Sequence, residues 1–213
     1  MSRSRKRTSS DAISWPRSWA LMRPLHRAVR RMADSGPSRS TGDRAGSELD
    51  IEIVRKSAAW DSVPITDAML SRAAIAAFAA AAAAEGQATH EVTLVLTDDA
   101  EMRELNRVWR GKDAPTNVLS FPSGESQGEP RLLGDVVLAC ETVEREAKLQ
   151  GIATPDHAAH LVVHGLLHLL GHDHLNEDEA LKMETLETEI LASLGIADPY
   201  ADTEPAEIAE VSL

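Results

Sequence analysis

The stretch DHAAHLVVHGLLHLLGHDH, residues 156–174, is the most informative part of this chain, because it joins an apolar helical pattern to six of the eight histidines. His164 and His168 are four residues apart. In a helix of 3.6 residues per turn their rings project about 40° apart on adjacent turns and can bind one ion. Gly171 can take the left-handed conformation that ends a helix and reverses the chain. We expect that turn to bring His174 towards the open side of the pair.

Three neutral imidazoles around one ion leave a fourth coordination position for water or substrate, as in catalytic zinc sites. The sequence therefore predicts one zinc ion per chain, with His164, His168 and His174 as its ligands. His160 lies one turn before this pair, and we expect it to support the site from behind the ligands or to belong to the core. Asp173 is a candidate acceptor for the second N–H of a ligand, or a residue that forms the turn.

Zinc proteases carry a similar helix, in which the motif H-E-x-x-H places a glutamate directly after the first histidine as the general base. This chain has Gly165 at that position. A peptidase built on this helix would need a general base from another part of the chain. A metallopeptidase that uses the same three-histidine zinc site is therefore kept only as an alternative function. A third possibility is a non-catalytic ribosome-assembly factor, in which zinc only pins the helix to the following turn.

The rest of the chain predicts an α/β fold of the α+β type. Apolar runs predict four strands, over residues 49–53, 92–97, 117–121 and 134–139. Helical spacing predicts five helices, over residues 66–85, 99–109, 141–150, 155–170 and 178–194. The N-cap of the second helix is Asp98 or Asp99. We expect a single domain, in which a small mixed four-stranded sheet packs with helices and a zincin-like helix carries the metal.

Charge divides the chain into unlike parts. Residues 1–47 hold eleven Lys/Arg and three Asp/Glu, a net charge of +8, whereas the remainder holds eleven basic and thirty-one acidic residues, a net charge of −20. We expect a basic, disordered N-terminal extension over 1–47, a folded catalytic domain over 48–199 and an acidic tail over 200–213. The extension is open to several interpretations: a disordered terminus without a function, a basic arm that touches RNA, a transit peptide, or a true start of the chain at Met22 or Met32.

The composition excludes several classes of protein. No apolar run is long enough to span a membrane, and no secretory signal is evident. The single cysteine, Cys140, allows no internal disulfide and no cysteine-based metal cluster, which suits a cytoplasmic protein. An acidic body argues against binding nucleic acid over its whole surface, so an RNA-directed function would need a local basic patch or a metal.

Three separated blocks in this sequence closely resemble the YbeY family of bacterial and organellar endoribonucleases, also called rRNA maturation factors. The blocks are LNRVWRGKDAPTNVLSFP (105–122), LLGDVVLA (132–139) and HGLLHLLGHDH (164–174). The resemblance implies a zinc-dependent, single-strand-specific endoribonuclease that matures the 3′ end of small-subunit ribosomal RNA and acts in ribosome quality control. Its implied partners are single-stranded RNA, ribosomal RNA and the small ribosomal subunit, and not DNA or a membrane.

The family's functional residues map onto this chain as the three histidine ligands and Arg110. Phosphodiester cleavage builds negative charge on oxygen atoms, which a metal ion and a nearby guanidinium stabilise, so we expect Arg110 and His164 to be catalytic. Arg107 and Lys112 would form a small basic patch beside Arg110. Two polar residues of the next strand are candidates to line the substrate groove, or simply to end or pair that strand: Asn117 and Ser120.

Overall fold

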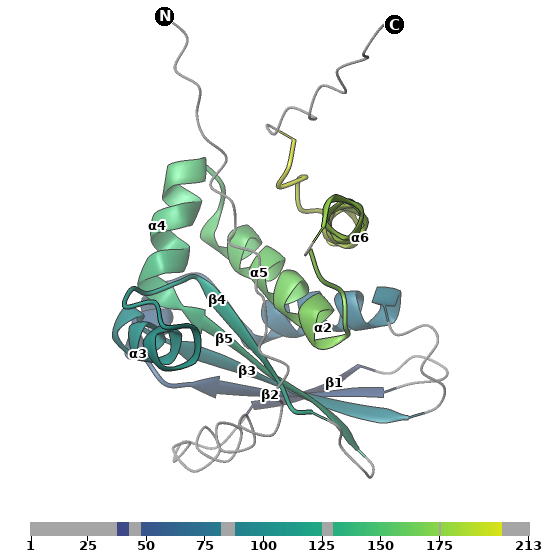
Figure 1. Ribbon diagram of the computed structural model, residues 1–213, viewed down its shortest axis with the longest axis horizontal. Coiled ribbons are helices and arrows are strands. Elements are labelled where there is room, and N and C mark those ends of the chain that lie inside the picture. The colour runs from purple at the N-terminus through teal and green to yellow at the C-terminus, as the bar shows by residue number, and fades with distance from the viewer. Residues whose placement is uncertain (1–37, 43–47, 82–87, 125–129, 175, 202–213) are drawn as a thin grey trace, which may run out of the picture.

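A mixed sheet is the framework of this computed structural model, which describes residues 38–42, 48–81, 88–124, 130–174 and 176–201. Within them the strand order is β1-β2-β3-β5-β4 (Figure 1). The strands are β1 (Ser38–Gly42), β2 (Glu48–Arg55), β3 (Thr89–Thr97), β4 (Val118–Pro122) and β5 (Arg131–Ala139). The central strands β2, β3 and β5 are parallel, and the edge strands β1 and β4 run antiparallel to their neighbours.

All four predicted strands are confirmed, and β1 is an addition to them. It pairs with β2 so that Ser38 lies opposite Ile53 and Gly42 lies opposite Leu49. This strand falls inside residues 1–47, where the composition predicts no folded structure. An edge strand can join a sheet through backbone hydrogen bonds alone, so it needs no apolar pattern. The rest of the predicted extension, and residues 202–213 of the predicted tail, lie outside the described residues.

The five predicted helices are also confirmed. They are α2 (Asp67–Ala81), α3 (Asp99–Arg110), α4 (Cys140–Gln150), α5 (Thr154–Leu169) and α6 (Glu177–Ser193), and a short 3-10 helix, η2 (Ala58–Ser62), follows β2. Asp98 is the N-cap of α3, because its side chain accepts a 2.9 Å hydrogen bond from the N–H of Glu101. The predicted end of the first helix near residue 85 lies outside the described residues. No helix in the described ranges is long and apolar enough to cross a membrane.

Helices cover both faces of the sheet (Figure 1). On one face α2 and α5 pack against the strands and each other, and α6 packs on this pair. Successive side chains of a strand point to opposite faces of the sheet, and each face has its own hydrophobic core. Val136 of β5 faces α5 in one core, whereas Val137 faces α3 in the other. The smaller core under α3 includes Phe121, which contacts Trp109 edge-on at 5.9 Å between ring centroids. The helix that carries the histidines therefore lies directly on the sheet.

Candidate functional site

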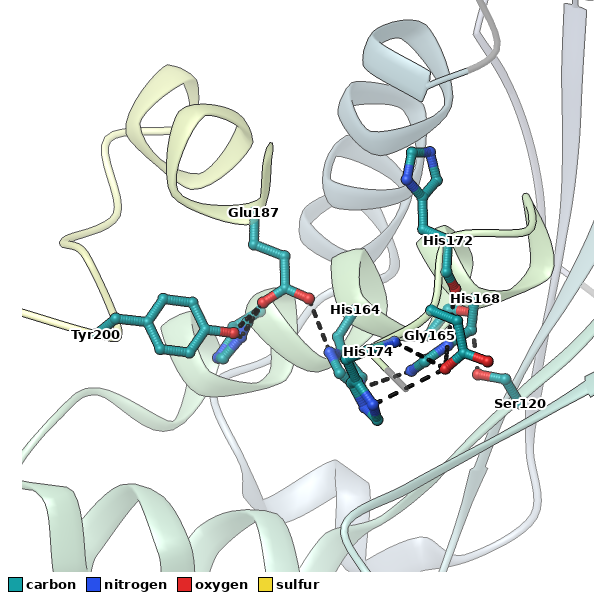
Figure 2. A network of polar contacts seen from close by, with 10 residues as sticks. Ser120, His164, Gly165, His168, His172, His174, Glu187 and Tyr200 are labelled. Carbon is teal, nitrogen blue, oxygen red and sulfur yellow. Dashed lines mark hydrogen bonds and ion pairs between the residues drawn. The ribbon is translucent and has the colours of Figure 1, made fainter. Parts of the chain in front are cut away.

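Three histidines meet at the C-terminal end of α5. His164 and His168 project from its last turns, and His174 follows the turn after the helix (Figure 2). One ring nitrogen from each lies within 4.8 Å of the others. The Nε2 atoms of His164 and His168 are 3.2 Å apart, and the ring centroid of His174 lies 4.9 Å from that of His168. The structure thus brings the three predicted ligands together.

The turn after α5 positions two of these rings. Gly171 has a φ of +89°, its N–H donates to the carbonyl of His168 at 3.1 Å, and the N–H of His172 donates to the carbonyl of Leu167 at 3.0 Å. This is the Schellman arrangement, which needs a left-handed residue at the Gly171 position. The carbonyl of His172 then accepts a 3.0 Å hydrogen bond from Nδ1 of His168, while the His172 ring points away from the three ligands (Figure 2). The same turn therefore brings in His174 and orients His168.

Both helical ligands have Nδ1 engaged and Nε2 turned towards the centre. Nδ1 of His164 lies 2.7 Å from Oε1 of Glu187, and Nδ1 of His168 donates to the carbonyl of His172. A neutral imidazole with its hydrogen on Nδ1 has a lone pair on Nε2. Two lone pairs at 3.2 Å repel unless a cation lies between them. Two ligands of a tetrahedral zinc ion, each 2.0 to 2.1 Å from it, are about 3.3 Å apart. The residues present therefore fit zinc.

His168 is held in the form that binds metal. Burial, with smaller contributions from the neighbouring His164 and His174, lowers the pKa of His168 to about 3. The neutral imidazole is the ligating form, so at neutral pH His168 needs to lose no proton to bind an ion.

Glu187 of α6 is part of this site, although the sequence motifs did not single it out. Its Oε1 accepts from Nδ1 of His164, and its Oε2 accepts from the hydroxyl of Tyr200 (Figure 2). Oε2 also accepts from Nε2 of His160 at 3.0 Å. Burial raises the pKa of Glu187, but the hydrogen bonds from His160 and His164 outweigh it and hold the pKa below its usual value. Glu187 is therefore an ionised carboxylate directly behind a ligand.

One signal in the sequence could have found Glu187. It is four residues from Met183 and four from Leu191, both of which are buried, so it occupies the apolar face of α6. A carboxylate on the buried stripe of a helix needs a partner. The abundance of glutamate along α6 hid this one among exposed neighbours.

The predicted supporting residues, His160 and Asp173, take different places. His160 contacts the carboxylate of Glu187, behind His164, and does not belong to the group of three converging histidines. Asp173 accepts a 2.8 Å hydrogen bond from the N–H of His174, and its carboxylate lies 3.8 Å from Nδ1 of His174 and 4.0 Å from Nδ1 of His168. Those ring distances are too long for hydrogen bonds. Of its two predicted roles, Asp173 therefore fits that of a turn-forming residue.

The two residues proposed for a substrate groove, Ser120 in β4 and Asn117 directly before it, both have hydrogen-bond partners within the protein. Ser120 is buried, and its hydroxyl donates to the carbonyl of Gly165 at 3.0 Å. Asn117 donates from Nδ2 to Glu146 at 2.8 Å and accepts from the N–H of Val118 at 2.7 Å. These contacts fit the alternative prediction, that the two residues end or pair a strand, and a role in a substrate groove stays a prediction.

The three residues of the predicted basic patch differ in their contacts. Arg107 is exposed and paired with Glu104 through two hydrogen bonds of 2.6 and 2.9 Å. Lys112 also has an interaction partner. Arg110 is half-buried at the end of α3, and no hydrogen bond or ion pair with a described residue occupies its guanidinium or links it to the three histidines. Arg110 thus keeps its hydrogen-bonding capacity, and its role remains a prediction.

Gly165, the position of the protease glutamate, faces the sheet. A Cβ atom there would lie 2.7 Å from Cγ1 of Val136 and 2.9 Å from Oγ of Ser120. Real Cβ atoms do not approach their neighbours so closely, because protein interiors are close-packed. The helix therefore needs glycine at this point, and a side chain at position 165 would not point to the histidines.

The fold and site define an α/β protein with an open candidate metal centre: three histidines converge, and in the described ranges no fourth side chain joins the group. The family model described as Endoribonuclease YbeY matches residues 57–195. The chain therefore belongs to the YbeY family, and the resemblance seen in the sequence is confirmed.

Curated relatives agree with this assignment. Endoribonuclease YbeY of Bradyrhizobium diazoefficiens is 51% identical over 149 residues, covering 67% of this chain and 80% of the relative. The protein of the same name from Parvibaculum lavamentivorans is 45% identical over 188 residues, covering 82% and 99%. That of Rhodospirillum rubrum is 54% identical over 154 residues, covering 67% and 77%.

Proposed function

We propose that this protein is a zinc-dependent, single-strand-specific endoribonuclease of the cytoplasm, which matures the 3′ end of small-subunit ribosomal RNA and serves ribosome quality control. The open three-histidine group carries the zinc part of the proposal, because its Nε2 separation of 3.2 Å suits two ligands of one ion. The name Endoribonuclease YbeY, borne by relatives 45 to 54% identical, favours RNA as the substrate. Ribosomal RNA and the small subunit are the proposed partners.

Bound zinc would supply a Lewis acid that polarises a phosphate oxygen. His164 and His168 would hold it through Nε2, and His174 through one ring nitrogen. The Nδ1 hydrogen bonds to Glu187 and to the carbonyl of His172 keep the first two rings from rotating. A ligand set fixed in this way loses little conformational freedom when the ion binds.

Arg110 is the proposed phosphate-binding cation. Its guanidinium can donate to two phosphate oxygens at once, and no described residue competes for it. Arg107 is paired with Glu104 and exposed, so it would contribute less. On a body as acidic as this one, a single free guanidinium near the substrate would favour local binding of RNA over general attraction.

Peptide hydrolysis, the first alternative, is disfavoured by the packing of Gly165. The general base of the H-E-x-x-H proteases follows the first histidine, and here that position contacts Val136 and Ser120 with no room for a side chain. A purely structural zinc, the second alternative, is disfavoured by the ligand number. Structural zinc sites have four protein ligands, whereas the group found in the described ranges has three.

Cleavage of a single-stranded RNA oligonucleotide, measured beside bound zinc, tests the proposal. We expect His164→Ala and Arg110→Ala each to reduce cleavage by about 10²-fold or more, because each removes stabilisation of the developing charge. Only His164→Ala should lose zinc. Arg103→Ala is the matched control, since Arg103 lies on α3 like Arg110 but is exposed and paired with Asp113. This variant should keep both RNA cleavage and bound zinc.

Three outcomes would contradict the proposal. Loss of zinc from Arg110→Ala would contradict the separate roles proposed for the histidines, which bind the metal, and for Arg110, which binds phosphate. Chelator-sensitive peptides released from a denatured protein substrate, without RNA cleavage, would favour the peptidase. Ribosome co-sedimentation that persists while the wild-type chain cleaves no RNA would favour a non-catalytic assembly factor.

A further inference from the structure

We propose that Glu187 and Tyr200 form a positioning unit for the metal centre: Tyr200 anchors the Glu187 carboxylate, and Glu187 sets the tautomer and orientation of His164, and so the affinity for zinc. The proposal deepens the proposed function, since its zinc readout rests on an ion bound by the three histidines. It adds two residues from outside the histidine motif to the site.

The environment of Glu187 supports a role beyond packing. Its residue is 0% exposed, and such a buried carboxylate is costly unless its oxygens are satisfied. Both oxygens are satisfied, and every donor belongs to this one network: His164 on Oε1, and His160 with Tyr200 on Oε2. Replacing this cluster with apolar side chains would remove the desolvation cost. Its presence therefore points to a task that needs a negative charge at this place.

That task is the control of His164. A carboxylate oxygen 2.7 Å from Nδ1 holds the hydrogen on that atom and leaves the lone pair on Nε2, which faces Nε2 of His168. Metal-binding histidines usually donate their second N–H to such an acceptor, which fixes the ring and makes it a better ligand. His168 uses the backbone carbonyl of His172 for the same purpose. Of His164 and His168, only His164 therefore has a charged acceptor at Nδ1.

Tyr200 extends the unit into the segment after α6. Its hydroxyl donates to Oε2 of Glu187, its ring meets the edge of the His160 ring at 5.8 Å between centroids, and its N–H donates to Asp198 at 2.8 Å. Burial, with the adjacent Glu187 charge, raises the pKa of Tyr200 above its usual value, so the hydroxyl keeps the proton that it donates. Tyr200 lies beyond residues 57–195, the part that the family model matches, and beyond the predicted domain end at residue 199.

Zinc affinity, measured on the full chain by competition with a chromophoric chelator, is the first test. Glu187→Gln should weaken zinc binding about 10- to 100-fold, the usual effect of losing a partner behind a ligand. Tyr200→Phe removes one hydrogen bond to a more distant oxygen and should weaken binding about three- to tenfold. Glu189→Gln, the same change at an exposed position of α6, is the control and should stay within about twofold of wild type.

The tautomer of His164 in the zinc-free protein is the second test, and a packing role alone would not move it. Long-range ¹H–¹⁵N correlation spectra should show the Nδ1–H form of His164 in wild type and loss of that preference in Glu187→Leu, whose side chain has no acceptor. An unchanged tautomer in folded Glu187→Leu, or a zinc affinity of Glu187→Gln equal to that of wild type, would overturn the proposal.

The two tests also separate this proposal from the proposed function. A wild-type chain that binds no zinc would contradict the proposed function. The tautomer of His164 in the zinc-free protein would still decide whether Glu187 positions that ring. Should Glu187→Gln fail to fold, Tyr200→Phe decides: a three- to tenfold loss of zinc affinity supports the unit, and affinity within twofold of wild type overturns it.

Discussion

The hydroxyl of Ser120 donates a 3.0 Å hydrogen bond to the carbonyl of Gly165, so the edge strand β4 is joined directly to the helix that carries two of the three candidate metal ligands. Such a contact is possible only because residue 165 has no side chain. The helix axis lies close to the sheet at this point. The positions of His164 and His168 relative to the strands are therefore set by backbone packing.

Gly165→Ala should destabilise the protein. In an exposed helix this change stabilises by about 1 kcal/mol, because glycine has the lower helix propensity. Here the added Cβ would lie 2.7 Å from Val136 and 2.9 Å from Ser120, so overpacking should reverse the sign and cost about 1 to 3 kcal/mol of unfolding free energy. Urea denaturation measures this. In a Val136→Ala background the loss should be smaller, and a Gly165→Ala protein more stable than wild type would contradict the packing.

Gly171→Ala should reduce both stability and zinc affinity. Gly171 and Gly195 both end helices with positive φ, +89° and +79°, and an added Cβ would meet no atom within 4 Å at either place. Each substitution should therefore cost about 1 to 2 kcal/mol through backbone strain alone. Only Gly171 shapes the turn whose carbonyl orients His168, so only Gly171→Ala should weaken zinc binding, by about tenfold. Equal zinc affinities in the two folded variants would contradict this role of the turn.

Adding zinc should stabilise the zinc-free protein. An ion that binds only the folded state at 100 times its dissociation constant raises the unfolding free energy by about 2.7 kcal/mol. Thermal or urea unfolding with and without zinc checks this value. His168→Ala should lose the increment, and magnesium, which prefers oxygen ligands, should not produce it in wild type. Equal stabilisation by both ions would argue against binding at the histidines.

Cys140 should resist alkylation in the native state. Burial, with smaller effects of Glu144, Glu141 and Asp99, raises the pKa of its thiol to about 12. Iodoacetamide at pH 8 should label the urea-unfolded chain and leave the folded chain almost unlabelled, because the thiolate is the reactive form. Cys140→Ala is the control for labelling elsewhere. Rapid labelling of the native protein would contradict the burial.

The same shift predicts how stability depends on pH. The folded thiol keeps its proton up to about pH 12, whereas an unfolded thiol loses it above about pH 8.5. The unfolded state then binds fewer protons, so the unfolding free energy should fall as the pH rises between these values. Cys140→Ala should show a shallower decline over that window.

Most of the fold could be predicted because its signals are local. The apolar spacing of β3, β5 and α5 is visible within each segment, and the four predicted strands and five predicted helices are present. The additional strand β1 could not be predicted, because Ser38–Gly42 joins the sheet through its backbone and carries no apolar pattern. The sequence also did not reveal that Ser120 is enclosed by α5, since the packing of a strand against a distant helix leaves no mark on local spacing.

For the metal centre the division between sequence and structure follows the same physics. The sequence by itself determined the convergence of His164, His168 and His174, because four residues are about one helical turn and a glycine permits the reversal that follows. Only the tertiary structure decided which acceptor stands behind His164. Glu187 reaches Nδ1 of His164 through the packing of α6 on α5, and Tyr200, which follows α6, contacts Glu187. Both contacts depend on helix placement over many residues.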